Sequence, residues 1–446
     1  MKNCVALIVA SVLGVIGAAQ TPSWEQERAA GKAALEQRRF ADAEAALNRA
    51  LVEAQQFAES DPRLATSLKD VAELQRLQGR YAEAEPLLKL ALSLTEMALG
   101  PEHPDLSKDL DALARVCFAQ MKLADSEALY RRSLAILEKA HGLESLDLLP
   151  TLGNLARISQ TLSRHEQTQA LLERSLAIRE KNQGTEHPDV ALELNRLARH
   201  HASLKNFAPA EPLYQRALAI QEKAFGLEHI ILTGTLDNLA WLYRQQERFG
   251  EAEPLFRRSL ILRQTAYGPL HPELAPAFDN LAGVLLELKR YGEAEPLYER
   301  SLFLYSGVLG PDHPQVATAH EYVGLVQAFQ SKYAAAETHY REALNIRENL
   351  TVTSLNNLAL VSVAQEKLTD AEPLYKVALA ILDRPQPAAV AASKPAEPGA
   401  EPPALVTTLE NYADLLKQMR RSTEARRVEA RAKRLLKAQA LPPPER

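Results

Sequence analysis

The sequence repeats itself every 42 residues, and this period limits the fold more than any other feature. The motif Ala-Glu-Pro-Leu recurs with each start a multiple of 42 from the others, at Ala84, Ala210, Ala252 and Ala294. Related sequences fill the missing positions at Ser126, Thr168 and Ala336. Glycines follow the same spacing at Gly100, Gly142, Gly184, Gly226, Gly268 and Gly310. A repeat of this length indicates stacked, similar supersecondary units rather than one globular core.

Within one repeat, the apolar residues have the spacing of two helices. The first expected stripe consists of Leu236, Leu239, Ala240 and Tyr243. The second consists of Ala252, Leu255, Phe256, Ser259 and Leu260, after a turn at 248–250. Offsets of three, four and seven place such residues on one face of a helix. Neither helix can bury its stripe alone, so neighbouring units must stack.

Prolines and glycines mark the expected helix ends. Pro254 is expected near the start of the second helix, where proline costs no hydrogen bond. Gly268 is expected to end that helix in a left-handed conformation, and Pro272 is expected to open the next one. The sequence therefore predicts an all-α solenoid of about ten stacked helix-turn-helix repeats.

Composition excludes several other classes of protein. The chain has 446 residues, 46% of them hydrophobic, so it is a folding chain rather than a disordered one. Two cysteines cannot support a disulfide scaffold. A net charge of −5 does not indicate the basic surface that binding of nucleic acid requires.

The pattern of one repeat resembles that of a known family. Leu236, Leu239, Ala240 and Tyr243, followed by Phe249, Ala252 and Phe256, resemble the tetratricopeptide repeat, whose usual period is 34. The period of 42 and the block 309–314 (Leu-Gly-Pro-Asp-His-Pro) are similar to the kinesin light chain-type subclass. The resemblance extends over about residues 24–437. It implies an all-α, right-handed superhelical solenoid whose role is to bind other polypeptides.

The ends of the chain and one internal segment depart from the repeat. Residues 1–19 contain one charge and then an apolar run that closes on small residues, which is typical of a secretory signal peptide. The alternative is an uncleaved membrane anchor, for which the run is short. The expected organisation is a signal peptide at 1–19, a solenoid at 20–383, a Pro/Ala-rich disordered insertion at 384–404, a capping helix pair at 405–440 and a disordered tail at 441–446. The insertion is read as a tolerated surface segment, with a ligand for a proline-binding domain as the alternative.

The last expected helix is strongly basic. Its buried side is expected at Ala425, Val428, Ala432, Leu435 and Leu436. Its other positions carry Arg426, Arg427, Arg431, Lys433, Arg434 and Lys437. A solvated outer face for a terminal repeat explains this charge. The alternative is a patch that meets anionic lipid or an acidic partner.

No motif for catalysis, cofactor binding or metal binding stands out. One histidine recurs per repeat, at His103, His187, His229, His271 and His313, and we expect these side chains to cap loops because neighbouring repeats are too far apart to share a metal. Cys117 occupies a core position and is expected to be a buried, unreactive thiol. We therefore expect no enzyme activity, no cofactor and no metal. The rival interpretation is an enzyme that uses acids such as Asp237 and Asp279.

The resemblance implies an inner groove lined by the first helix of each repeat. The family's ninth helix position corresponds to Glu73, Arg115, Arg157, Arg199, Trp241, Gly283 and Leu325. The sixth corresponds to Asn154, Arg196, Asn238, Asn280, Tyr322 and Asn357. The candidate peptide-binding residues are Arg115, Asn154, Arg157, Arg196, Arg199, Asn238, Trp241 and Asn280. The alternative is that the arginines are solvated or pair with acids such as Asp111.

These residues predict the chemistry of a partner. Arginines suit carboxylates, asparagines suit a peptide backbone and Trp241 offers an apolar anchor. We expect a non-catalytic scaffold or adaptor, exported to the periplasm or beyond, that binds a protein or peptide whose acidic residues flank an apolar one, and no nucleic acid. A membrane-tethered assembly factor is the alternative. Membrane contact is expected only through an uncleaved anchor or the basic last helix.

Overall fold

The computed structural model describes residues 23–58, 61–346, 352–383 and 404–439. All regular secondary structure in these ranges is helical, with twenty α-helices and one short 3₁₀ helix, which confirms the predicted all-α repeat fold. Three expectations lie outside the described residues: the signal peptide at 1–19, almost all of the insertion at 384–404 and the tail at 441–446.

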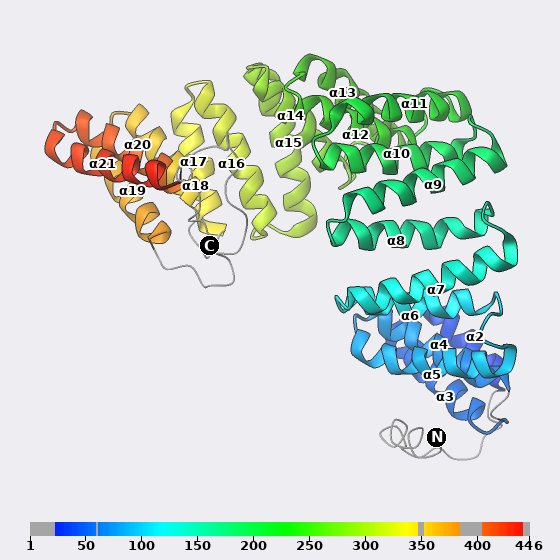
Figure 1. Cartoon of the computed structure of the whole chain (residues 1–446). Helices are drawn as coiled ribbons and strands as arrows, with labels where there is room; N and C mark the ends of the chain where they lie inside the picture. The colour runs from blue at the N-terminus through cyan, green and yellow to red at the C-terminus, as the bar shows by residue number, and fades with distance from the viewer. Residues whose placement is uncertain (1–22, 59–60, 347–351, 384–403, 440–446) are drawn as a thin grey trace. The chain divides into compact units, whose positions relative to one another are not determined.

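The chain forms two compact units that divide between Leu204 and Lys205. In the first unit each helix packs against the next one along the chain (Figure 1). Its helices are α2 (Trp24–Glu36), α3 (Phe40–Ala54), α4 (Pro62–Leu77), α5 (Tyr81–Leu99), α6 (Leu106–Ala119), α7 (Leu123–His141), η1 (Leu146–Leu148), α8 (Leu149–Thr161), α9 (His165–Gln183) and α10 (Pro188–Ser203).

The second unit has the same order of packing within it. Its helices are α11 (Phe207–Phe225), α12 (Leu232–Gln245), α13 (Phe249–Tyr267), α14 (Leu274–Glu287), α15 (Tyr291–Leu309), α16 (Pro314–Phe329), α17 (Tyr333–Ile346), α18 (Val352–Ala364), α19 (Leu368–Leu382), α20 (Ala404–Gln418) and α21 (Ser422–Gln439). The described helices thus supply two for each of the ten expected repeats. None of them is long and apolar enough to cross a membrane.

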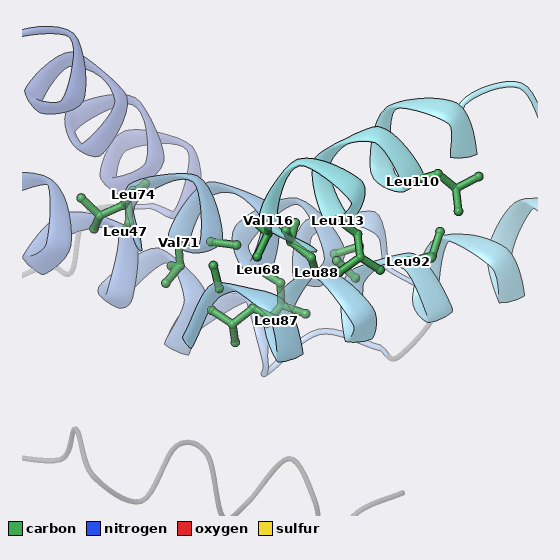
Figure 2. Close-up of a cluster of buried hydrophobic side chains, with 14 of the residues drawn as sticks. Leu47, Leu68, Val71, Leu74, Leu87, Leu88, Leu92, Leu110, Leu113 and Val116 are labelled. Carbon is green, nitrogen blue, oxygen red and sulfur yellow. The ribbon is translucent and has the colours of Figure 1, made fainter. Parts of the chain in front are cut away.

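The core follows the predicted stripes. Leu236, Leu239 and Tyr243 on α12 are buried, as are Phe256 and Leu260 on α13. Figure 2 shows the equivalent packing in the first unit, where apolar side chains of three successive helices point toward one another. This cluster includes Leu68, Val71 and Leu74 of α4, Leu87, Leu88 and Leu92 of α5, and Leu110, Leu113 and Val116 of α6. Each stripe is therefore buried only by neighbouring helices.

The recurring histidines accept hydrogen bonds from the backbone at the ends of the loops between repeats, as predicted, and His187 and His313 are also the N-caps of α10 and α16. In each case, Nδ1 accepts a hydrogen bond from the backbone N–H two residues later, at 3.1–3.2 Å. The residues are His103, His187, His229, His271 and His313. Among the described residues, no group of three or more histidine, cysteine or acidic side chains could hold a metal ion.

Two predictions about helix ends are wrong. The second helix α13 begins at Phe249, directly after the turn, so Pro254 lies inside α13, beyond its first turn, and removes one backbone hydrogen bond. Pro272 precedes α14, which begins at Leu274. The apolar stripe of the second helix begins at Ala252, and it does not show that α13 already starts at Phe249, before this first buried residue.

The glycine prediction needs a smaller correction. Gly268 has the expected positive φ of 81°, but its ψ of 166° lies outside the left-handed helical region. This combination is accessible essentially only to glycine. The equivalent glycines after α5, α7, α9, α11 and α15 have the same geometry. The requirement for glycine at this position is therefore stricter than predicted.

The turns inside the repeats place residues with side chains at positive φ. Glu247 has φ 58° and Lys289 has φ 59°. At the equivalent turn of an earlier repeat the chain has Gly79, and glycine adopts a positive φ without steric cost. We expect Glu247→Gly to raise the free energy of unfolding by about 0.5–1 kcal/mol, because it relieves this strain. Denaturant unfolding would measure the change. Glu299→Gly, an exposed position inside α15, should instead lower stability by about 1 kcal/mol; equal effects of both variants would contradict the assignment.

An ionic ladder connects neighbouring repeats. The glutamate of each Ala-Glu-Pro-type sequence pairs with the basic residue just before the second helix of the next repeat. Examples are Glu85 with Lys122 at 2.5 Å and Glu253 with Arg290 at 2.6 Å. The other pairs are Glu127–Arg164, Glu211–Arg248, Glu295–Lys332, Glu337–Lys367 and Glu372–Arg421. Where the sequence has Gln169 in place of the glutamate, it has Asn206 in place of the base.

This ladder predicts acid sensitivity. Hydrogen bonds from Lys122 and Lys89 lower the pKa of Glu85 from 4.5 to about 2. Since the pKa is depressed by folding, its stabilisation is present above about pH 4.5 and is lost as the pH falls toward 2. We expect Glu85→Gln to destabilise the protein at pH 7 and to have little effect near pH 2, in urea unfolding at each pH. Glu36→Gln, at an exposed carboxylate, is the control. An effect of Glu85→Gln that did not depend on pH would contradict the ionic origin.

Two further predictions concern single side chains. Cys117 is buried, as predicted, and burial raises the pKa of its thiol. Ala425 and Ala432 on α21 are buried as expected, but Leu436 is 39% exposed. The prediction for Leu436 is wrong because α21 packs on α20 through a narrower face than the sequence stripe indicated.

Candidate functional site

Three of the candidate arginines occupy equivalent positions on successive first helices of the first unit. Arg115 lies on α6, Arg157 on α8 and Arg199 on α10, and each is exposed between buried neighbours along its helix. We call the exposed residues of the first helices the first-helix face. The period of 42 residues places one guanidinium of this face on each of these three successive repeats.

These arginines differ from most others in the protein in having no ion pair. Arg132 on α7 pairs with Glu96 and Arg174 on α9 pairs with Glu138, whereas Arg115, Arg157 and Arg199 form no ion pair within the described residues. Asp111, the partner that the alternative interpretation named, accepts a hydrogen bond from Thr151 at 3.2 Å. Burial raises the pKa of Asp111, and the nearby charge of Arg115 opposes this rise. None of the three guanidiniums is therefore held in an ion pair, although the charge of Arg115 acts on the Asp111 carboxylate.

Four candidate residues line one pocket. This pocket has a volume of about 390 Å³ and lies among α8, α9 and α10. Arg196 reaches across it toward α8, where a Cβ on Gly153 would lie 3.6 Å from its Nη1. Arg196 also forms an ion pair with Glu193 at 3.2 Å. The candidates in the lining are Asn154, Arg157, Arg196 and Arg199.

A buried histidine completes the wall of this pocket. His200 is 2% exposed, and among the described residues no group meets the geometry of a full hydrogen bond to either ring nitrogen. Burial, together with the neighbouring His201 and His165, lowers its pKa. His200 is therefore neutral at pH 7, and the positive charge of the pocket comes from its arginines.

Arg157 has a second contact that orients it. Its guanidinium carbon lies 4.4 Å from the centre of the Phe118 ring on α6. Such a contact holds the side chain while leaving its N–H groups available at the ring's edge. An arginine held in this way loses little conformational entropy when it binds a carboxylate.

The remaining candidates lie on the second unit. Asn238 on α12 and Asn280 on α14 are half-buried and form no hydrogen bond within the described part of the chain. Trp241 is 39% exposed, with its ring edge-on to Phe256 and the guanidinium of Arg244 at 4.7 Å from its centre. Trp241 is thus held in place from two sides and offers an apolar surface.

Sequence reasoning missed an apolar pocket in the second unit. It has a volume of about 260 Å³ and lies among α16, α17 and α18. Phe329 and Leu360 are 53% and 44% exposed in its lining, beside Leu325 and Asn357 at the ninth and sixth positions. The missed signal was a shortened repeat: Leu360 follows Leu325 by 35 residues, so it occupies the same ninth position.

The ninth position therefore changes character along the chain. In the first unit it carries Glu73 and three arginines, whereas in the second it carries Trp241, Gly283, Leu325 and Leu360.

The acids of the rival catalytic interpretation are each engaged within their own repeat. Asp237 pairs with Arg263 at 2.7 Å, and Asp279 accepts a hydrogen bond from Tyr305 at 3.1 Å.

Comparison with known families identifies the repeat. A model of the tetratricopeptide repeat matches residues 63–139, 147–223, 191–265, 232–302 and 273–349, and a second model of this repeat matches 351–382. Because these matches cover more than half of the chain, the protein belongs to the tetratricopeptide repeat family. Proteins of this family generally act as scaffolds for protein interactions. No curated protein matches the sequence.

Several solved structures are similar to this chain. Repeats of a Podosopora anserina protein described as a kinesin light chain are 22% identical, with 46% of this chain and 96% of that chain covered and a TM-score of 0.42. BtubC (BKLC) from P. vanneervenii is 23% identical, with 56% and 92% covered and a TM-score of 0.43. A signal transduction ATPase (STAND) from Pyrococcus horikoshii with a tetratricopeptide repeat sensor is 16% identical, with 73% and 47% covered and a TM-score of 0.52. Of these three, the last has a TM-score above 0.5, and at 16% identity that likeness concerns the fold alone.

Proposed function

We propose that this protein is a non-catalytic scaffold that binds an extended polypeptide on its first-helix face. The observation that carries the proposal is the row Arg115, Arg157 and Arg199, which has no ion pair in the described structure although most arginines elsewhere on the helices have one. An arginine without an ion pair in its own protein contributes favourably to the free energy of binding when the partner supplies a carboxylate.

The partner is a protein or peptide in which acidic residues flank an apolar one. The pocket among α8, α9 and α10 offers Arg157, Arg196 and Arg199 to carboxylates. Asn154, Asn238 and Asn280 can both donate to and accept from a peptide backbone. Trp241 and the pocket lined by Phe329 and Leu360 offer apolar contacts.

Preorganisation is the mechanism of this binding. Each first helix is held between its neighbours by buried apolar side chains and by the ionic ladder, so the binding residues are in position beforehand. A flexible peptide loses conformational entropy when it binds, but the receptor loses little.

Selection from a library of short random peptides tests the proposal. We expect the selected peptides to be enriched in acidic residues next to a large apolar residue, and to bind with an affinity that falls as salt rises. Leu360→Ser should weaken the apolar preference, with Trp241 still present, while keeping the acidic one. Selected peptides with no charge preference would contradict the proposal.

Export belongs to the same proposal. The apolar run before Ala19 supports secretion by a signal peptide, with the protein acting outside the cytoplasm. N-terminal sequencing of the exported product should give a chain that begins at or near Gln20. A product that retains Met1 and sediments with membranes would favour the tethered alternative.

A further inference from the structure

The C-terminal helix α21 carries a cationic face that its own fold leaves uncompensated. Arg426, Arg427, Lys433, Arg434 and Lys437 are all exposed. None of these five residues forms an ion pair within the described ranges. Arg434 donates a hydrogen bond to the backbone carbonyl of Ala430, which leaves its charge in place.

The acids of α21 cannot neutralise these residues, because both already have partners. Glu424 pairs with Arg421 at 2.7 Å, and Glu429 pairs with Lys417 at 2.5 Å. Both partners precede α21 in the chain. Of the basic residues on the helix, Arg431 pairs with Asp383. The five remaining cations thus have no acid in contact among the described residues.

The five cations form one continuous face. At 100° per residue, Arg426, Lys433 and Lys437 fall in one row, and Arg427 and Arg434 lie beside it, so that all five occupy an arc of roughly 120°. On the same projection, the buried residues Ala425 and Ala432 lie on the opposite side of the helix. The cationic face is therefore directed away from α20.

From this arrangement we infer that α21 docks on the surface of an anionic lipid bilayer. Its cations spread over about 16 Å of helix without converging on one point. Lipid headgroups offer negative charge at any spacing in a plane, and clusters of four to eight basic residues on one helix bind such surfaces.

Other polyanions fit this face less well. Proteins that bind nucleic acid have basic surfaces that extend over a domain. This chain has a net charge of −5 and its cationic face is confined to one helix, so it does not fit that pattern. An acidic protein would require cations that converge on defined carboxylates, as they do in the pocket among α8, α9 and α10. The lipid inference does not depend on peptide binding at the first-helix face.

Sedimentation of the full chain with vesicles tests the inference. The probes are vesicles of phosphatidylcholine alone and of phosphatidylcholine with about 30% phosphatidylglycerol. We expect binding to the anionic vesicles that is lost between about 0.05 and 0.5 M NaCl. The variant Arg426→Gln/Lys433→Gln/Lys437→Gln should weaken this binding on the order of 100-fold.

The matched control is Arg38→Gln/Lys289→Gln/Arg300→Gln, which removes the same charge from exposed sites elsewhere. It should bind the anionic vesicles nearly as the unmodified chain does, and both variants should melt at the unmodified temperature. Equal binding of the α21 variant and the control would overturn the inference. So would binding of duplex DNA or polyglutamate through these residues without binding to vesicles.

Discussion

Replacing Leu110 by alanine is expected to lower the free energy of unfolding by about 2–5 kcal/mol. Leu110 is fully buried on α6 and belongs to the cluster formed with α4 and α5 (Figure 2). Truncation removes apolar contacts and leaves a cavity that rigid neighbouring helices fill only in part. Urea unfolding and hydrogen exchange would measure the loss.

The control is the same substitution at an exposed site, Leu77→Ala on α4, where the side chain is 46% exposed. It should change stability by about 0.5 kcal/mol or less. In a repeat protein each unit contacts only its neighbours, so the loss of exchange protection in Leu110→Ala should be largest in α4–α7. Uniform loss along both units would contradict this local cooperativity.

Reversing the charge of Arg115, Arg157 and Arg199 together is expected to weaken binding of selected acidic peptides on the order of 100-fold or more. Replacing each arginine by glutamate would remove a charge-assisted hydrogen bond to a carboxylate of the peptide, and the new glutamate would repel that carboxylate. Because the three side chains are exposed, the melting temperature should stay the same. Fluorescence anisotropy with a labelled peptide would measure the affinity.

The control reverses Arg38, Arg300 and Arg420, which are also exposed but lie off the first-helix face. It changes the net charge by the same amount, so it separates local contacts from the overall field of the protein. The two variants should differ most at low salt and converge as salt rises. Similar weakening by both variants would remove the arginine row from the proposed site.

Some features of the fold and the candidate site could be predicted from periodicity. A strict period of 42 residues repeats one helix register, so residues such as Arg115 and Arg157 must occupy equivalent positions on their helices. The same argument identified the capping histidines, because a loop position that recurs with the period has one local role. Cys117 was placed in the core because it aligns with Tyr243.

Other features could not be predicted because they depend on neighbouring helices. The pocket lined by Phe329 and Leu360 requires three helices to leave a gap, and the shortened repeat hides the alignment of Leu360. Leu436 belongs to an apolar stripe in the sequence, yet α20 covers only part of α21. The start of α13 before Pro254 is set by the turn geometry rather than by the apolar pattern.

By itself, the sequence determined the repeat length, the helical class and the faces that are buried, because hydrophobic spacing along one chain decides which side of a helix leaves water. Only the tertiary structure decided which charges remain without an ion pair. Most arginines acquire partners from neighbouring helices, and the neighbour of a side chain depends on packing rather than on distance along the chain. The arginine row of the first unit and the cationic face of α21 remain without such partners in the described structure, and both binding proposals follow from that difference.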